Sequence, residues 1–179
     1  MTGQIQSTSY DQLSVDEHIQ LRAVREGEAV ALFECTDSSR EYLSEYLPWV
    51  NKTNSPEDSL AFIQKTQSER IEGSLFGFGI YCDNQLVGHI SLMRISDGQK
   101  PEIGYWLGEG HSGKGIATKA TGRVTQFGFE TLGLNEILIK AAVKNIGSNR
   151  VAQKLGYEMS GTEKSDNGTK INVWRKTNE

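Results

Sequence analysis

Residues 111–118 read His111-Ser112-Gly113-Lys114-Gly115-Ile116-Ala117-Thr118, a glycine-rich turn between two segments of different patterning. The segment before the turn, residues 102–107, has the pattern of a strand, and the segment after it has the pattern of a helix. In such a turn the glycines let the backbone approach an anion, and the free N–H groups of the first helical turn point at it. Residues 112–118 therefore predict a phosphate-binding site, with a plain strand–helix turn as the alternative.

A second segment favours the phosphate site over that alternative. Residues 145–157 read Asn145-Ile-Gly-Ser148-Asn-Arg-Val-Ala-Gln-Lys154-Leu-Gly156-Tyr157. Together the two segments resemble the GNAT superfamily of N-acetyltransferases, whose loop reads Gln/Arg-x-x-Gly-x-Gly/Ala and cradles the pyrophosphate of acetyl-CoA. Gly115 and Ala117 match the small residues of that loop, whereas Ser112 departs from the usual Gln or Arg.

The second segment and the run Tyr46-Leu47-Pro48-Trp49 are also similar to the RimJ/RimL branch of this superfamily, and the resemblance covers nearly the whole chain. Its best-known members acetylate the N-terminal amine of ribosomal proteins. The resemblance implies an enzyme that moves an acetyl group from acetyl-CoA to a protein N-terminal α-amine by direct attack in a ternary complex, and a homodimer is common in this branch. One alternative acceptor is a small amine, such as a polyamine, an amino acid conjugate or an aminoglycoside.

Another alternative is a non-catalytic acyl-CoA-binding module. Many family members carry a tyrosine acid at the position of Ala152, and both its absence and that of the Gln or Arg at Ser112 favour this alternative.

The resemblance also assigns the cofactor site. Asn145 is expected to bind the pantetheine amides, and Lys114 to help neutralise the CoA phosphates. For Asn145 the alternative is a polar turn residue, and for Lys114 it is a solvated helix face. The expected cofactor-binding residues are Trp106, Leu107, Ser112, Gly113, Lys114, Gly115, Ile116, Ala117, Thr118, Asn145 and Ser148.

Two residues are candidates for catalysis. Glu102 shares a strand face with Gly104 and Trp106, and a carboxylate there can accept the amine proton directly or through water. Its alternative is a solvated residue at the start of a strand. Ser148 is expected to hydrogen-bond the leaving sulfur, because the branch carries a serine three residues after the asparagine. Its alternative, compatible with the first, is the N-cap of the following helix.

Trp49 and Tyr105 are candidates for the acceptor pocket, with a place in the core as the alternative. The histidines His18, His89 and His111 and the two cysteines do not have metal-ligand spacing, so no metal is expected.

The composition predicts one globular domain over residues 1–179, with residues 1–12 frayed. No run approaches the roughly 18 apolar residues of a membrane span. The start of the chain does not resemble a signal peptide, so we expect a cytoplasmic protein with free thiols. The formal net charge of −4 argues against nucleic acid as the main partner.

Hydrophobic periodicity gives the order of elements. Strands are predicted over residues 18–24, 75–82, 86–95, 101–107, 137–143, 157–163 and 170–175. Helices are predicted over residues 26–35, 38–47, 55–71, 116–127 and 148–155. This order is an α+β fold with a mixed, mostly antiparallel sheet of six to seven strands flanked by helices. A crossover helix joins strands 101–107 and 137–143, so these two should be parallel. In the GNAT fold they splay apart around the pantetheine arm.

Overall fold

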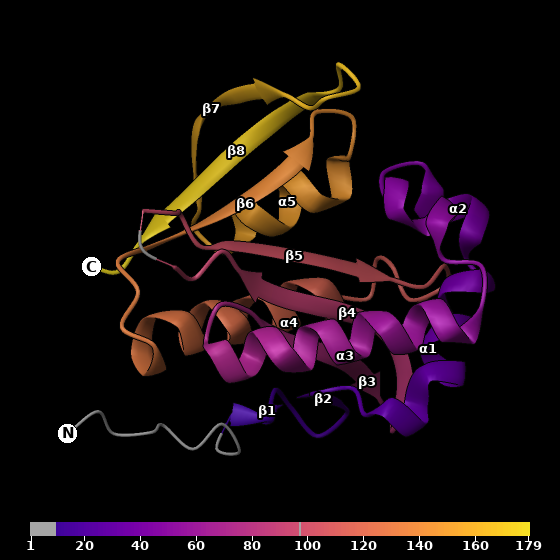
Figure 1. Ribbon diagram of the computed structural model, residues 1–179. Coiled ribbons are helices and arrows are strands. Elements are labelled where there is room, and N and C mark those ends of the chain that lie inside the picture. The colour runs from indigo at the N-terminus through magenta and orange to yellow at the C-terminus, as the bar shows by residue number, and fades with distance from the viewer. Residues whose placement is uncertain (1–9, 97) are drawn as a thin grey trace.

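The computed structural model describes residues 10–96 and 98–179, whose strands form one eight-stranded sheet in the order β1-β2-β3-β4-β5-β6-β8-β7 (Figure 1). The strands are β1 (Gln12–Ser14), β2 (Ile19–Arg22), β3 (Phe76–Cys82), β4 (Gln85–Met93), β5 (Glu102–Leu107), β6 (Glu136–Ala142), β7 (Glu158–Lys164) and β8 (Lys170–Thr177). The helices are α1 (Ala29–Asp37), α2 (Arg40–Ser44), α3 (Pro56–Glu72), α4 (Ile116–Gln126) and α5 (Ile146–Lys154). Short 3-10 turns form η2 (Glu26–Glu28) and η3 (Pro48–Lys52), and a π-helical turn forms η4 (Phe127–Thr131).

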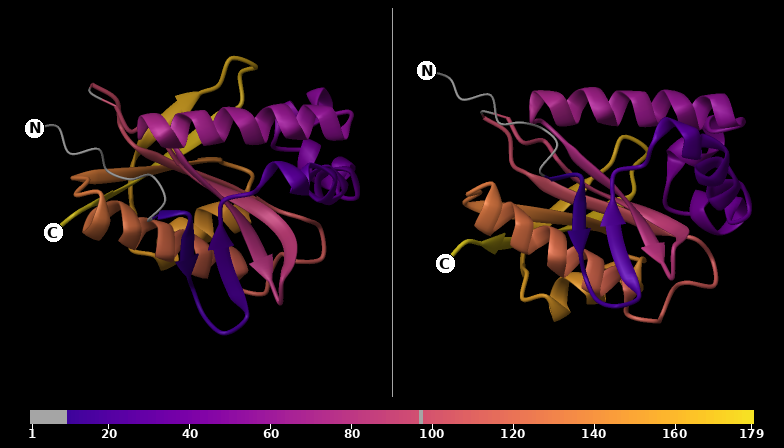
Figure 2. Two further views of the ribbon diagram at one scale, coloured as in Figure 1. Left: turned by 60° about the horizontal axis from the view of Figure 1, so that its bottom comes forward. Right: turned by 90° about the horizontal axis from the view of Figure 1, so that it is seen from below.

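Helices cover both faces of the sheet, α1 and α3 on one face and α4 and α5 on the other (Figure 2). The larger core lies on the α4 face. The predicted helix over residues 116–127 packs there through one apolar stripe, Ile116, Ala120, Val124 and Phe127, all of them buried. The Phe127 ring meets the rings of Phe76 and Phe78 edge-on, with centroids 5.4 and 6.0 Å apart. Each such pair contributes about 0.5–1.5 kcal/mol beyond its buried area.

The strands predicted over residues 75–82 and 86–95 form an antiparallel hairpin, β3–β4. Asp83 and Asn84 connect the strands with φ values of 48° and 66°. Positive φ at both central residues is the two-residue turn whose twist matches the twist of the strands, and Asp and Asn tolerate it better than most residues do.

The parallel pair is also confirmed, and it opens the sheet. β5 and β6 are paired only at Glu102–Leu138 and Ile103–Ile139. Beyond these residues β6 keeps its full antiparallel pairing with β8, while β5 stays with β4. The two strands therefore diverge toward their carboxyl ends and leave a gap in the middle of the sheet (Figure 1).

Two boundaries differ from the sequence prediction in the N-terminal half. Residues 38–47 do not form one helix, because α2 ends at Ser44 and Pro48 begins the separate turn η3. Proline fits this first helical position, where no N–H is required. Residues 26–35 likewise divide into η2 and α1, which extends to Asp37.

The sheet has one strand more than the six to seven expected, because β1 begins at Gln12, the last residue of the segment expected to fray. Residues 1–9 lie outside the described part of the chain. Tyr10 and Gln12 do not fit the expectation: the Tyr10 ring lies 5.6 Å from the Phe127 ring, and Gln12 pairs with Arg22 of β2. A three-residue strand is too short to show a period, so only its partners reveal it.

Candidate active site

A cleft of about 440 Å³ lies at the gap between β5 and β6, between α2 and the first turns of α4 and α5. Its walls bring together most of the residues predicted to bind a cofactor. They are Trp106, Leu107, Ser112, Gly113, Gly115, Ile116, Ala117, Thr118, Asn145 and Ser148. Tyr105, which was predicted for the acceptor pocket, lines the same cleft. The chain therefore folds the two motifs onto one cavity, which we call the cofactor cleft after the predicted role of these residues.

The glycine loop has the backbone that an anion site requires. Gly113 and Gly115 have φ values of 74° and 80°, a left-handed conformation that side chains other than glycine adopt only with strain. A Cβ added at either glycine would meet no atom within 4 Å, so the space beside the loop is open. Gly115 is the N-cap of α4, whose first intrahelical bond runs from Lys119 N–H to the Gly115 carbonyl. The N–H groups of residues 116–118 precede this bond and are available to a phosphate.

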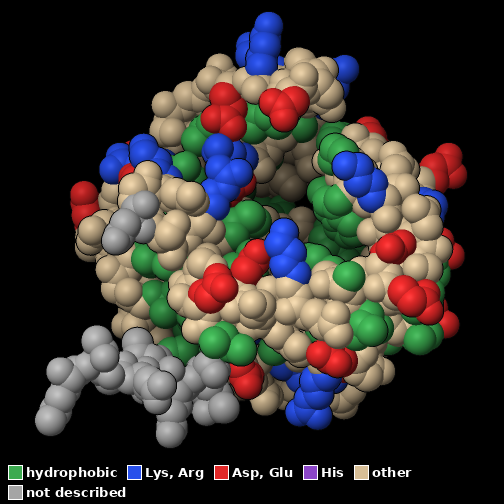
Figure 3. Space-filling model, viewed as in Figure 1, with side chains coloured by type: hydrophobic (Ala, Val, Ile, Leu, Met, Phe, Trp, Pro, Cys, Tyr) green, Lys and Arg blue, Asp and Glu red, His purple; other side chains and the backbone are tan. Residues whose placement is uncertain are grey.

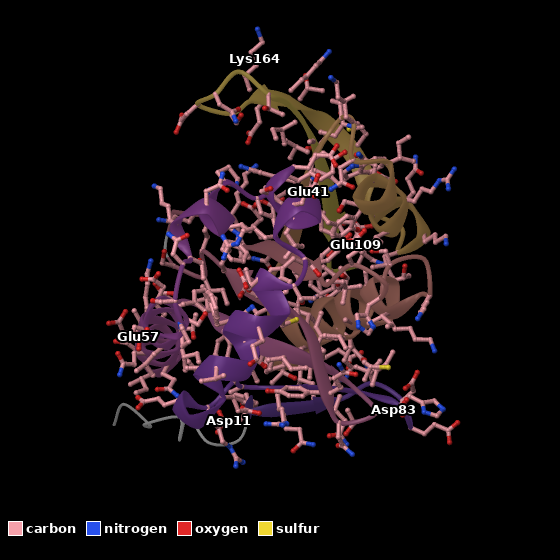
Figure 4. All side chains as sticks on the ribbon, turned by 90° about the vertical axis from the view of Figure 1, so that its right-hand side faces the viewer. Asp11, Glu41, Glu57, Asp83, Glu109 and Lys164 are labelled. Carbon is pink, nitrogen blue, oxygen red and sulfur yellow. The ribbon has the colours of Figure 1, made fainter. Side chains whose placement is uncertain are left out.

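Helix α2 borders the same cleft and is tied to its rim. Ser39 Oγ accepts a hydrogen bond from Glu109 N–H at 2.8 Å, and Tyr46 Oη donates to the Lys144 carbonyl at 3.5 Å. Figure 4 shows this end of the molecule, with Glu41 on α2 above Glu109 of the loop that follows β5. α2 therefore bridges the two edges of the gap.

The basic residues on the cleft wall differ from the prediction. Lys114 is exposed and is not among the lining residues, whereas Arg150 and Lys154 of α5 are. These two lie one helical turn apart, so both reach the same side of α5. The sequence did not indicate them, because they follow Asn145 and lie far from the glycine loop along the chain.

The first turn of α5 corrects one prediction about Ser148. The N-cap is Asn145, whose Oδ1 accepts a hydrogen bond from Ser148 N–H at 3.2 Å, and α5 begins at Ile146. Asn caps a helix at least as well as Ser, and Asn145 has the non-helical backbone of a cap. Ser148 lies inside the first turn, where its Oγ accepts a hydrogen bond from Tyr105 Oη at 3.0 Å. The serine hydroxyl is thus free of capping and lies on the cleft wall.

Asn149 holds this turn in place and was missed by the sequence analysis. Its Oδ1 accepts hydrogen bonds from Asn172 Nδ2 at 3.0 Å and from Trp174 Nε1 at 2.8 Å. Its Nδ2 donates to the carbonyls of Ala142 and Asn145. One amide therefore fixes α5 against β6 and β8, which only the folded sheet brings together.

A second cavity of about 450 Å³ lies on the α3 face of the sheet and shares Leu47, Tyr105 and Trp106 with the cofactor cleft. Its lining includes Trp49, whose ring lies 5.8 Å from that of Trp106. Figure 3 shows the hollow on this face, with hydrophobic side chains around it. Trp49 and Tyr105 therefore both line this cavity, and their role in an acceptor pocket stays a prediction.

His89 forms part of the floor of this second cavity. The side chain is buried, and Nδ1 lies 3.5 Å from Ser91 Oγ. Burial, with a smaller effect of the Arg70 charge, lowers the pKa of His89 to about 4. The imidazole is therefore neutral at pH 7.

Glu102 is not among the lining residues of either cavity. It lies on the β5 face that also carries Gly104 and Trp106, both of which line the second cavity. Its Oε2 lies 3.7 Å from Arg94 Nε and 3.9 Å from Lys140 Nζ. Burial raises the pKa of Glu102, although the charges of Lys140 and Arg94 act in the opposite direction. The carboxylate is thus a stronger base than an exposed one, on the face of β5 that farther along lines the second cavity.

Residues 10–96 and 98–179 contain neither a metal-binding cluster nor a membrane-spanning helix. No group of three or more His, Cys, Asp or Glu side chains there could hold a metal ion. No helix in the same residues is long and apolar enough to span a membrane.

Comparison with known proteins agrees with this geometry. The family model of the acetyltransferase (GNAT) domain matches residues 18–158. The ribosomal-protein-serine acetyltransferase of Escherichia coli (strain K12) is 31% identical over 150 residues, covering 83% of this chain and 84% of that protein. The putative ribosomal N-acetyltransferase YdaF of Bacillus subtilis (strain 168) is 30% identical over 162 residues, covering 88% and 86%.

Solved structures confirm the expected fold. RimL, a ribosomal L7/L12 α-N-protein acetyltransferase in complex with coenzyme A, has a TM-score of 0.87 at 24% identity, covering 93% of this chain and 97% of that chain. The microcin C7 self-immunity acetyltransferase MccE, in complex with acetyl-CoA and AMP, has a TM-score of 0.88 at 24% identity, covering 96% and 98%. With a family model over most of its length and relatives of 30% identity or more, the chain belongs to the GNAT family of acetyltransferases.

Proposed function

We propose that this acetyltransferase moves the acetyl group of acetyl-CoA to the N-terminal α-amine of a protein, and that the protein is ribosomal. The observation that carries the transfer is the meeting of the two cavities at Tyr105 and Trp106. A donor in the cofactor cleft and an amine in the second cavity would reach each other there without leaving the protein. The acceptor class rests on the names of the two curated relatives, both of which refer to ribosomal proteins.

The residues divide the work in this proposal. Acetyl-CoA supplies a thioester carbonyl. The N–H groups at the start of α4 would hold its pyrophosphate, with Arg150 and Lys154 beside them. Asn145 would hydrogen-bond the pantetheine arm. Glu102 would accept the proton of the attacking amine through water, since it lies outside the second cavity but on the β5 face that lines it. Ser148 would donate a hydrogen bond to the sulfur as the carbon–sulfur bond breaks.

We further propose that the enzyme is cytoplasmic and forms a homodimer. Light scattering on the purified protein tests the dimer, because the mass of one chain is 19.9 kDa.

The deciding experiment follows the release of free CoA thiol. The protein is mixed with acetyl-CoA and one acceptor at a time, drawn from peptides with free N-termini, the same peptides with blocked N-termini, polyamines and aminoglycosides. The proposal requires thiol release with free-N-terminal peptides and none with their blocked counterparts.

The other outcomes each contradict a different part. Release with polyamines or aminoglycosides alone would replace the protein acceptor by a small amine. Stabilisation by acetyl-CoA, with no release for any acceptor, would favour the non-catalytic acyl-CoA-binding alternative. No stabilisation by acetyl-CoA would overturn the assignment of the glycine loop.

A further inference from the structure

Tyr105 lines both cavities, and its hydroxyl is hydrogen-bonded to the first turn of α5. Its side chain is mostly buried, and its Oη donates to Ser148 Oγ at 3.0 Å. The two residues come from β5 and α5, on opposite sides of the gap, and both lie on the wall of the cofactor cleft. No other side chain in residues 10–96 and 98–179 hydrogen-bonds the Ser148 hydroxyl.

We propose that Tyr105 is a positioning residue that orients the Ser148 hydroxyl toward the leaving sulfur of acetyl-CoA. This inference rests on the proposed function. The tyrosine acid that many family members carry is replaced here by Ala152, a buried residue with no polar side chain. Ser148, on the same helix as Ala152, supplies the hydrogen bond to the sulfur in its place, and Tyr105 orients it from the other side of the gap.

The geometry gives the pair two effects. A serine in the first turns of a helix otherwise turns its hydroxyl toward nearby backbone carbonyls. The hydrogen bond from Tyr105 occupies one lone pair of Ser148 Oγ, so the serine proton is left to point elsewhere, into the cleft. A hydroxyl that accepts a hydrogen bond is also a stronger donor, by roughly 10–30% for each bond in a chain. The position of Ser148 near the N-terminus of α5 adds a positive potential that favours a thiolate.

The bonds and charges balance without transfer of the tyrosine proton. The amine nitrogen bonds to the acetyl carbon and gives its proton to Glu102 or water. The carbon–sulfur bond breaks, and its electron pair goes to the sulfur. A free thiol has a pKa of about 8.5 and a free phenol one of about 10, so the phenol keeps its proton. Ser148 and Tyr105 therefore stabilise the thiolate by hydrogen bonding, and CoA takes any final proton from water.

The test compares Tyr105→Phe, Ser148→Ala and the double variant. Tyr105→Phe keeps the ring that fills the gap and removes only the hydroxyl. We expect kcat to fall about threefold to tenfold, the effect of one hydrogen bond, with the KM for acetyl-CoA within about twofold of its original value. The double variant should be no slower than Ser148→Ala, because Tyr105 acts only through the serine.

A second readout reports on the sulfur directly and does not require an acceptor. The thiolate of bound CoA is titrated by its ultraviolet absorbance, against the complex with desulfo-CoA to subtract the tyrosines. We expect Tyr105→Phe and Ser148→Ala each to raise the pKa of the bound thiol. A merely structural role of Tyr105 would leave that pKa unchanged.

Tyr157→Phe is the matched control. It removes another buried tyrosine hydroxyl, bonded to Thr125 Oγ1 at 2.7 Å, that lines neither cavity. We expect kcat and the thiol pKa to stay as in the original protein. An unchanged thiol pKa in Tyr105→Phe, or an equal further loss of kcat when Tyr105→Phe is added to Ser148→Ala, would overturn the inference. Failure of the proposed function would show differently, as no thiol release by the original protein with any acceptor.

Discussion

Tyr42 and Ser112 lie 70 residues apart in the chain, and their hydroxyl oxygens are 2.7 Å apart. The bond joins α2 to the loop that precedes α4, across the rim of the cofactor cleft. Ser112 is the position at which the family usually carries Gln or Arg. In this chain the small serine leaves room for the tyrosine of α2, so a contact within the protein occupies that position.

Removal of the hydrogen bond between Tyr42 and Ser112 should weaken the binding of acetyl-CoA without affecting the chemical step. One hydrogen bond at a partly exposed site contributes about 0.5–1 kcal/mol, so Tyr42→Phe and Ser112→Ala should each raise the Kd for acetyl-CoA about twofold to fivefold. Isothermal titration calorimetry on both single variants and the double variant checks this. The two effects should not add, because each variant removes the same bond. Additive losses would mean that the hydroxyls act separately.

The substitution Gly115→Trp should abolish binding of acetyl-CoA while the protein stays folded. The side chain would enter the open space beside the loop, where we expect the pyrophosphate, and the φ of 80° adds about 1–2 kcal/mol of strain. Calorimetry measures the binding, and circular dichroism measures the fold.

Gly168→Trp is the matched control for this strain. Gly168 has a φ of 82° with nothing within 4 Å of an added Cβ, and it lies in the β7–β8 turn, away from both cavities. It should lose similar stability and still bind acetyl-CoA. If both variants or neither lost binding, the glycine loop would not be the phosphate site.

Glu102→Gln should lower kcat more than it changes the affinity for acetyl-CoA. If Glu102 is the base, the rate falls on the acid side as the carboxylate is protonated, and burial places this limb above the range of an exposed glutamate. The variant should lose that limb, which a pH profile of kcat from about pH 4 to 9 would record.

Glu163→Gln is the control for charge in this cluster. Glu163 lies 3.0 Å from the same Lys140 that neighbours Glu102, but it is exposed on β7. The profile of Glu163→Gln should keep its acid limb. An unaltered pH profile in Glu102→Gln would show that the carboxylate serves only in the ion pairs with Arg94 and Lys140, and that water accepts the proton.

His89 should make the protein less stable in acid. Its pKa is lowered to about 4 in the folded state, against about 6.5 when unfolded, so the unfolded chain binds the proton more readily. The free energy of unfolding is therefore unaffected by this group above about pH 6.5 and falls between about pH 6.5 and 4, by about 3 kcal/mol in all.

Urea unfolding across this pH range measures the effect, and His89→Asn removes the titrating group. The decline of stability with falling pH should be shallower in His89→Asn than in the original protein. If stability fell equally steeply with pH in the original protein and in His89→Asn, the pKa of His89 would be the same in the folded and unfolded chain.

The sequence by itself determined the local elements and the two binding motifs. Periodicity predicted the helix over residues 116–127, because a helix repeats its face every three to four residues, and α4 buries Ile116, Ala120, Val124 and Phe127 on one such face. The glycines of the loop permit the left-handed backbone that Gly113 and Gly115 adopt, because a glycine has no Cβ. These features depend on neighbours in the chain, so they can be read from the chain.

Only the tertiary structure decided how side chains from distant segments meet. It assigned the cap of α5 to Asn145, excluded Lys114 from the cleft wall in favour of Arg150 and Lys154, and joined Tyr105 to Ser148. It also set Glu102 between Arg94 and Lys140, outside both cavities. These contacts depend on the divergence of β5 from β6, which arises because each strand keeps its antiparallel partner. Pairing between distant strands leaves no local pattern, and so the site geometry exists only in the folded sheet.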